Sequence, residues 1–251
     1  MTRLYDAAEA YEIAFSYRDL AGEADALERW YGRRPGSVLE LAAGPADHAL
    51  EFAARGVRAA ALDLSPAMCD RARANAVRRG VKLDVHEADM TSFALDDSFD
   101  LAICMIDSIA HVLTLDALVA HLAAVRAHLT EQGCYIVETS HPAEYLAHAK
   151  RVETEWAQER DGRRAYFRWG NPEDRIDPIT QVTPYRVTIT LDGVLVADEV
   201  VPNRFWTPDE LDAAGRLAGL RTVARYGDFA GLPLADERAW RHIVVYRAVE
   251  G

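Results

Sequence analysis

The chain has 251 residues, of which 50% are hydrophobic and 27% are charged. This balance is typical of a soluble globular protein and excludes a disordered, collagen-like or membrane-embedded chain. The 40 acidic and 28 basic residues give a formal net charge of −12 at pH 7. Because so negative a surface repels phosphate groups, we expect a small-molecule partner and neither nucleic acid nor a membrane.

The first twenty residues are charged throughout, and no apolar run reaches membrane-spanning length. The cysteines are three in number, widely spaced and without a CxxC pair: Cys69, Cys104 and Cys134. They are interpreted as buried free thiols in a reducing compartment, so we expect a cytoplasmic protein. His121 and His128 form only a weak pair without a nearby cysteine, and we expect no metal site.

The predicted elements begin with a helical segment over 5–31 and continue with alternating strands and helices. Strands are expected over 37–42, 57–63, 81–86, 99–106 and 133–140, and helices over 46–55, 65–79 and 115–129. Ser65 and Thr114 are predicted to cap the second and third of these helices. Such alternation requires crossover connections, which predicts a parallel sheet covered by helices on both faces.

From about residue 150 the pattern becomes antiparallel. The dipeptides Asp161-Gly162 and Asp192-Gly193 each separate two strand-like runs, which predicts two tight hairpins. The strands of these hairpins are expected over 151–158, 163–169, 182–191 and 194–201. A capping box at 207–210 then opens a helix that extends to 217, and strands over 221–226 and 242–247 complete the main sheet.

The expected fold is therefore α/β: a Rossmann-like, mostly parallel, seven-stranded sheet with helices on both faces. Residues 1–35 would form an N-terminal helical lid, and residues 36–150 with 206–251 the core. Residues 151–205 would form an inserted antiparallel β flap. Such a flap offers an edge or a face for a partner, so a homodimer is possible.

In open parallel sheets, ligands bind beyond the carboxyl ends of the strands. The first strand continues into a turn with Glu40 and Gly44, and Asp63 follows Gly44 by 19 residues, near the interval expected for an acid on ribose hydroxyls. A dinucleotide fingerprint would place glycines where Ala42 and Asp47 stand, and Asp47 would repel a pyrophosphate. These carboxylates instead favour a ligand with sulfonium and ammonium groups. A plain strand-to-helix turn is the weaker interpretation, given Asp63 and a further acid after the third strand.

A resemblance to class I S-adenosylmethionine-dependent methyltransferases is carried by four segments between residues 38 and 140. They are VLELAAGPADHAL, AALDLSPAMCDRA, HEADMTSF and FDLAICMIDSIAHVL. The N-terminal YDAAEAYEIAFSYRD and the later VPNRFWTPDEL are similar to segments of amino-sugar N-methyltransferases. The chain departs from the family at Ala42 and Ala46, where glycine is more usual.

The resemblance implies S-adenosyl-L-methionine as the cofactor. It implies that Glu40, Ala42 and Gly44 cradle the methionyl portion. Arg18 resembles the residue that pairs with the cofactor carboxylate, and Tyr11 the tyrosine of the lid.

The resemblance also implies the contacts of the adenosine. Asp63 would hold the ribose hydroxyls, with Leu64 and Met68 against the adenosine. Asp89 and Met90 would meet the adenine. The residues expected beside the sulfonium, where the fourth strand ends, are Met105, Ile106 and Asp107.

Methyl transfer is a direct displacement, so the enzyme mainly aligns the reactants and accepts a proton. His111 is the first candidate for the base because an ordinary histidine pKa of about 6.5 suits that role; the alternative is a histidine capping a turn. His141 is the second candidate, with the alternative of a turn residue held by Pro142. Tyr5 is a weaker candidate for a substrate contact. The tryptophans that could line a substrate cavity, or simply pack the hairpins, are Trp156, Trp169 and Trp206.

The expected function is methyl transfer to a nitrogen or oxygen of a small-molecule metabolite. Two alternatives remain open: a nucleotide-dependent oxidoreductase on a similar sheet, and an S-adenosylmethionine-binding protein without catalysis.

Overall fold

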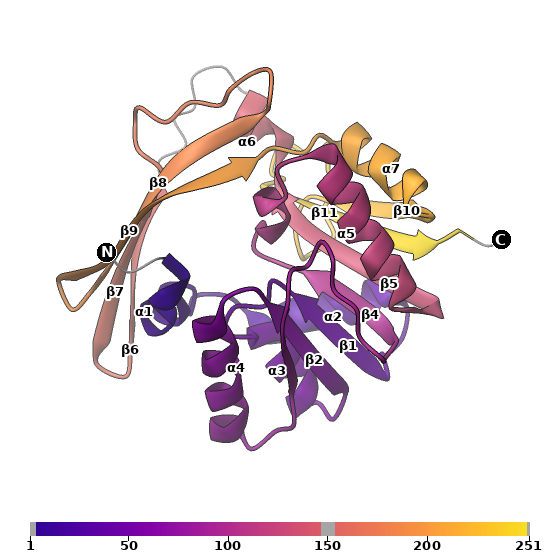
Figure 1. Cartoon of the computed structure of the whole chain (residues 1–251), viewed down its shortest axis with the longest axis horizontal. Helices are drawn as coiled ribbons and strands as arrows, with labels where there is room; N and C mark the ends of the chain where they lie inside the picture. The colour runs from indigo at the N-terminus through magenta and orange to yellow at the C-terminus, as the bar shows by residue number, and fades with distance from the viewer. Residues whose placement is uncertain (1–3, 147–153, 250–251) are drawn as a thin grey trace.

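The computed structural model describes residues 4–146 and 154–249. Within this part of the chain the larger of two sheets has seven strands in the order β10-β11-β5-β4-β1-β2-β3 (Figure 1). The strands are β1 (Ser37–Leu41), β2 (Arg58–Asp63), β3 (Asp84–Glu87), β4 (Phe99–Cys104), β5 (Leu129–Ser140), β10 (Leu220–Tyr226) and β11 (Arg241–Ala248). Neighbours among β1 to β5 are parallel, whereas β11 runs antiparallel to both β5 and β10. The expected seven-stranded, mostly parallel sheet is confirmed.

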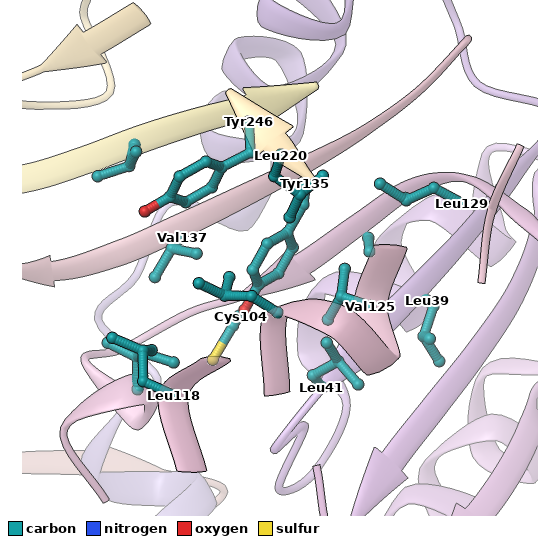
Figure 2. Packing of buried hydrophobic residues seen from close by; sticks show 14 of the residues in the cluster. Leu39, Leu41, Cys104, Leu118, Val125, Leu129, Tyr135, Val137, Leu220 and Tyr246 are labelled. Carbon is teal, nitrogen blue, oxygen red and sulfur yellow. The ribbon is translucent and has the colours of Figure 1, made fainter. Parts of the chain in front are cut away.

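Helices cover both faces of this sheet, because alternate strand residues point to opposite sides. On one side, Leu39 and Leu41 pack with Leu118 of α5 (Leu115–Ala127) and Leu211 of α7 (Pro208–Leu217); Figure 2 shows the α5 part of this core. On the other side, Val38 packs with residues of α2 (Leu20–Tyr31) and α3 (Asp47–Ala54). Next to α3, the helix α4 (Pro66–Arg79) packs its alanines against β2.

The predicted helix caps are present. The hydroxyl oxygen of Ser65 accepts from the Met68 N–H at 3.3 Å, and that of Thr114 accepts from the Ala117 N–H at 3.2 Å. Thr207 and Glu210 form the expected capping box at the start of α7. The three cysteines are buried and free, as predicted.

The flap is a separate four-stranded antiparallel sheet in the order β6-β7-β8-β9. Its strands are β6 (Thr154–Arg160), β7 (Arg163–Trp169), β8 (Val182–Leu191) and β9 (Val194–Arg204). Both predicted hairpin turns have positive φ angles at their two central residues, with Asp161 at 54° and Asp192 at 51°, each followed by a glycine. The first three residues of the predicted strand 151–158 lie outside the described residues.

The N-terminal segment predicted over 5–31 is helical, but it is divided into separate helices. The structure has a short 3₁₀ helix η1 (Leu4–Asp6), a helix α1 (Ala8–Ala14) and then α2. The break has a local cause, because the Asp19 carboxylate accepts from the Gly22 N–H at 3.1 Å and caps a new helix. As a result α1 packs on the flap, with Ile13 in one cluster with Phe167, whereas α2 packs on the main sheet (Figure 1).

One more short helix, α6 (Pro142–Leu146), follows β5. Among the described helices, none combines the length and the apolar character that crossing a membrane requires.

Candidate functional site

A cavity of about 1040 Å³ lies where the parallel strands β1, β2 and β4 end, facing η1, α1 and the flap. This is the edge at which open α/β sheets bind ligands, and the volume suits a small organic molecule. The predicted site residues that line it are Tyr5, Tyr11, Ala42, Gly44, Asp63, Leu64, Met68, Asp89, Met90, Ile106, Asp107 and His111. The structure therefore brings together most of the residues that the sequence indicated.

Asp63 is fixed at the end of β2 by two backbone groups. Its Oδ2 accepts from the Gly44 N–H at 2.7 Å, and its Oδ1 accepts from the Ser65 N–H at 2.8 Å. Burial raises the pKa of Asp63. Because the backbone holds both oxygens, the carboxylate has one orientation on the cavity wall, and its remaining lone pairs can accept from hydroxyl groups.

The turn after β1 adopts left-handed backbone conformations. The φ angles of Ala42, Gly44 and Ala46 are 48°, 54° and 62°. Such angles are ordinary for glycine and strained for alanine. Glycine would therefore fit these two positions without strain, and the alanines that replace it in this chain hold a strained backbone.

The loop after β3 is held by short hydrogen bonds. Asp89 Oδ1 accepts from both the N–H and the hydroxyl of Thr91, each at 2.7 Å. Met90 is supported from below by His121, whose Nδ1 donates to the Met90 carbonyl at 2.8 Å and whose Nε2 accepts from the Tyr135 hydroxyl at 2.6 Å. A carbonyl can only accept, so Nδ1 carries the proton, and burial lowers the pKa of His121 to about 4. His121 is thus a neutral support of the loop.

The segment after β4 is strained. Ile106 and Asp107 both have φ angles of 56°, and a β-branched residue rarely adopts this conformation outside functional sites. The Asp107 carboxylate accepts from the Thr139 hydroxyl at 2.5 Å and from the Ser140 hydroxyl at 2.6 Å. Burial raises the pKa of Asp107. The neighbouring Met105 is buried and does not line the cavity.

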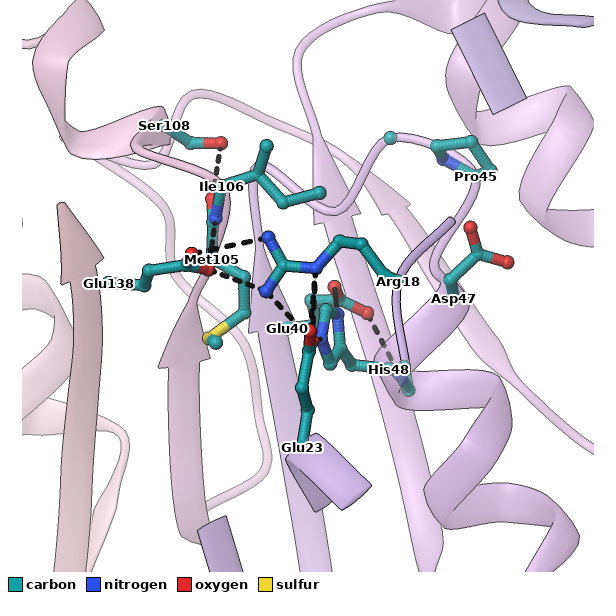
Figure 3. A network of polar contacts seen from close by, with 12 residues as sticks. Arg18, Glu23, Glu40, Pro45, Asp47, His48, Met105, Ile106, Ser108 and Glu138 are labelled. Carbon is teal, nitrogen blue, oxygen red and sulfur yellow. Dashed lines mark hydrogen bonds and ion pairs between the residues drawn. The ribbon is translucent and has the colours of Figure 1, made fainter. Parts of the chain in front are cut away.

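Two of the predicted cofactor residues, Arg18 and Glu40, belong to a buried polar network (Figure 3). Arg18 forms ion pairs with Glu23 and Glu138, each at 2.8 Å. The Glu138 Oε2 also accepts from the Ile106 N–H at 2.9 Å, so the network reaches the strained segment after β4.

The network continues through His48, which sequence reasoning missed. Its Nδ1 lies 3.1 Å from Glu40 Oε1, and its Nε2 lies 2.7 Å from Glu23 Oε2. Although burial lowers it, the hydrogen bonds to these two carboxylates raise the pKa of His48 to about 9. Arg18 and Glu40 are engaged in this network and do not line the cavity, so their expected cofactor contacts stay predictions.

His111 and Tyr5 meet on the cavity wall. The Tyr5 hydroxyl lies 2.7 Å from His111 Nε2, although 106 residues separate them in the chain. Burial lowers the pKa of His111 to about 4 and raises that of Tyr5 well above its usual range. The pair is therefore a neutral imidazole beside a neutral phenol, which differs from the ordinary histidine pKa on which the sequence argument relied.

His141 does not reach the cavity. Its Nε2 donates to the Leu234 carbonyl at 3.0 Å, and its Nδ1 accepts from the Ala143 N–H at 3.2 Å. Both ring nitrogens therefore have partners, and the one that involves Ala143 lies in the local turn, in keeping with the alternative considered for this residue. The structure gives no support to a base at His141.

The tryptophans divide as well. Trp156 and Trp169 of the flap line the cavity. Trp206 is buried in the main core, and its Nε1 donates to the Val112 carbonyl at 3.1 Å.

A further buried carboxylate, Glu12 of α1, was not indicated by the sequence. It forms ion pairs with Arg71 and Arg78 of α4 and with Arg160 of β6. Although burial raises it, the hydrogen bonds from these arginines lower the pKa of Glu12 to about 2. Glu12 thus joins the lid helix, the helix after Asp63 and the flap, each of which supplies part of the cavity wall.

Comparison with known proteins gives a family match for the region that contains Gly44, Asp63 and Asp89. Residues 38–133 match the family described as methyltransferase domain. This region of the chain is similar to a methyltransferase domain, in agreement with the expected resemblance to methyltransferases.

The chain also aligns with curated enzymes. The chain is 30% identical over 138 residues to a dTDP-4-amino-2,3,4,6-tetradeoxy-D-glucose N,N-dimethyltransferase of Saccharopolyspora spinosa. The alignment covers 53% of this chain and 54% of the relative, so it spans about half the length of that enzyme.

Solved structures share the fold over nearly the whole chain. An S-adenosylmethionine-dependent methyltransferase from Clostridium acetobutylicum has a TM-score of 0.78 at 16% identity, covering 97% of this chain and 98% of that one. The sugar N-methyltransferase KedS8 from Streptoalloteichus has a TM-score of 0.72 at 24% identity, covering 94% and 90%. The flap and the N-terminal segment therefore belong to the same fold as residues 38–133.

Proposed function

We propose that the protein transfers a methyl group from S-adenosyl-L-methionine to the amino nitrogen of an amino sugar. The observation that carries this proposal is the backbone-fixed carboxylate of Asp63 on the cavity wall, in a region similar to a methyltransferase domain. The amino-sugar class is supported by the curated relatives, which are named as N,N-dimethyltransferases of dTDP-linked amino sugars.

The residues present fit the cofactor. Asp63 offers an acceptor for ribose hydroxyls, as the sequence spacing predicted. Leu64 is 68% exposed although it is a large apolar residue, and it lines the cavity beside Met68. An apolar side chain left open next to a fixed carboxylate suits a nucleoside, whose base covers the apolar surface while its ribose bonds to the acid.

The bound cofactor supplies an electrophilic methyl group, and the chain's residues orient the acceptor and manage its proton. Because its pKa is about 4, His111 is neutral at pH 7, and in the tautomer with its proton on Nδ1 its Nε2 accepts a hydrogen bond from the Tyr5 hydroxyl. The Tyr5 oxygen is then free to accept from an N–H of the amine, which directs the nitrogen lone pair away from Tyr5. The attack itself requires the neutral amine, since an ammonium ion has no lone pair.

Other expectations stay proposals. We propose that the protein acts in the cytoplasm on a free small molecule, without nucleic acid or membrane, and that it forms a homodimer. The division into a lid (1–35), a core (36–150 and 206–251) and a flap (151–205) is a proposal of the same kind.

Cofactor titration tests the proposed function against the oxidoreductase alternative. In isothermal titration calorimetry we expect the protein to bind S-adenosylhomocysteine and to give no heat with NAD or NADP. Binding of a dinucleotide alone would refute the proposed function. Tight binding of S-adenosylhomocysteine without turnover on any amino sugar would favour the non-catalytic alternative.

A further inference from the structure

The inner face of β9 connects the two short helices that carry Tyr5 and His111. Glu199, Val201 and Asn203 alternate along β9 and all line the cavity. At one end, Glu199 Oε2 accepts from the Leu4 N–H of η1 at 2.9 Å. At the other end, Arg204 Nη1 donates at 3.2 Å to the carbonyl of Leu113, just after the short helix η2 (Ser108–His111). The row formed by Glu199, Val201 and Asn203 therefore runs alongside the Tyr5–His111 pair.

Neighbouring strands extend this row into a wall with aromatic side chains. Tyr185 of β8 is the register partner of Val201, and Trp169 of β7 is paired with the next inward-facing residue of β8. The ring centroids of Trp169 and Tyr185 are 6.0 Å apart, and both residues line the cavity. This part of the wall is broad and apolar.

Asn203 adds a polar group at the edge of the apolar wall. Its side chain is buried, with a residue exposure of 3%, and its Oδ1 has no hydrogen-bond partner among the described residues. Folded proteins rarely leave a buried carbonyl oxygen without a donor, and this oxygen belongs to a residue that lines the cavity, where a ligand could supply the donor.

We infer that this wall is the acceptor subsite and that it binds the ring of a deoxyamino sugar. Trp169, Tyr185 and Val201 contact the apolar face of the ring, and Asn203 hydrogen-bonds a ring hydroxyl. A deoxy sugar presents this combination of a flat apolar face and a few hydroxyl groups, and the subsite places its amino group beside Tyr5. The inference rests on the proposed function and names the residues that would give it sugar specificity.

The test is steady-state kinetics with free and dTDP-linked 3-amino- and 4-amino-deoxyglucoses as acceptors. We expect Asn203→Ala to raise the KM of the sugar about tenfold, the effect of losing one well-formed hydrogen bond, and to change kcat less than twofold. Trp169→Leu should raise the KM similarly. Both variants should bind S-adenosylhomocysteine like the wild type, which also shows that they fold. Thr188→Ala is the matched control, because Thr188 lies on β8 and belongs to the outward-facing set of that strand.

The outcomes separate the two proposals. If the wild type methylates an amino sugar but neither variant changes the KM, the subsite is wrong and the proposed function stands. If Asn203→Ala weakens S-adenosylhomocysteine as much as the sugar, Asn203 supports the fold and the subsite is wrong. If the wild type binds S-adenosylhomocysteine and methylates none of these sugars, the proposed function and the subsite both fail.

Discussion

At the scale of single residues, Asp63 carries the cofactor assignment. Asp63→Ala should weaken S-adenosylhomocysteine binding by about 2–3 kcal/mol, the range for hydrogen bonds to a charged group. The measurement is calorimetric titration of the folded variant. Asp70→Ala is the control, because Asp70 lies in α4, the helix that follows Asp63, and its side chain is 79% exposed. Equal affinity of the Asp63 variant and the wild type would place the ribose elsewhere.

His111 is expected to affect the rate more than the cofactor. His111→Ala removes the partner that orients Tyr5, so kcat should fall by about 10²-fold at pH 7, while S-adenosylhomocysteine affinity stays nearly constant. Because the orientation of Tyr5 does not depend on the protonation of the amine, the fold loss should be the same at higher pH.

The pH profile also tests the burial of His111. Because its pKa is about 4, protonation of His111 should reduce kcat only below about pH 5 and leave no step near pH 6.5. A kcat that is unchanged in His111→Ala at pH 7 would show that alignment by other residues carries the reaction.

The left-handed backbone of Ala46 leads to a prediction about the free energy of unfolding. In Ala46→Gly the relief of about 1–2 kcal/mol of backbone strain offsets the lost methyl burial and the larger entropy of the unfolded chain. The free energy of unfolding should therefore stay within about 0.5 kcal/mol of the wild type. Ala49→Gly, in the first turn of α3, has no strain to relieve and should lose about 1–2 kcal/mol. Urea unfolding of both variants checks this, and equal losses would contradict the strained conformation.

At the scale of elements, Glu12 holds the lid, α4 and the flap together. Glu12→Gln leaves three arginines without their charge partner, so the free energy of unfolding should fall by about 2–3 kcal/mol. This loss is at or below the range for breaking a buried ion pair, because the three arginines are partly solvated. Glu9→Gln on the same helix breaks only an exposed pair with Arg163 and should lose less than about 1 kcal/mol.

The stabilisation by Glu12 depends on pH because the pKa of its carboxyl group is lowered in the folded protein. The folded pKa of Glu12 is about 2 and its ordinary value is 4.5, so its stabilisation is complete above pH 4.5 and is lost as the pH falls toward 2. The difference in unfolding free energy between wild type and Glu12→Gln should accordingly narrow between pH 4.5 and pH 2. A constant difference across that range would show that the arginines do not lower the pKa of Glu12.

Element positions were well predicted where local signals decide them. The caps at Ser65, Thr114 and Thr207 act within a single turn and could be recognised from the sequence. The break before α2 was missed because Asp19 resembles any other charged residue of a helix until its carboxylate caps Gly22. Arg18 and Glu40 lie in a buried polar network whose other members the sequence did not indicate, and their cofactor contacts stay predictions. Glu138 did give a signal, since a carboxylate in an otherwise apolar strand requires a buried partner.

At the scale of the whole molecule, the alternation of strands and helices predicted the parallel sheet and the edge at which its ligand site lies. The sequence could not show that the 3₁₀ segment with Tyr5 and the one with His111 meet, because they are 106 residues apart and their contact depends on how the flap lies over the core. It also could not reveal the altered pKa values of His48 and His111, which arise from burial and from distant partners. The sequence motifs therefore indicate where the site lies, whereas tertiary contacts set the pKa values and the pairing of its side chains.

The central claim is methyl transfer from S-adenosyl-L-methionine to an amino sugar. Its most direct test is to incubate the protein with methyl-labelled S-adenosyl-L-methionine and dTDP-4-amino-2,3,4,6-tetradeoxy-D-glucose, together with free amino-deoxyglucoses, and to analyse the products by mass spectrometry. The account predicts that the label appears on the amino nitrogen of a sugar, with one S-adenosylhomocysteine formed for each methyl group, and that Asp63→Ala abolishes most of it at low cofactor concentration. Label found only on oxygen, or none on any sugar while S-adenosylhomocysteine binds, would contradict it.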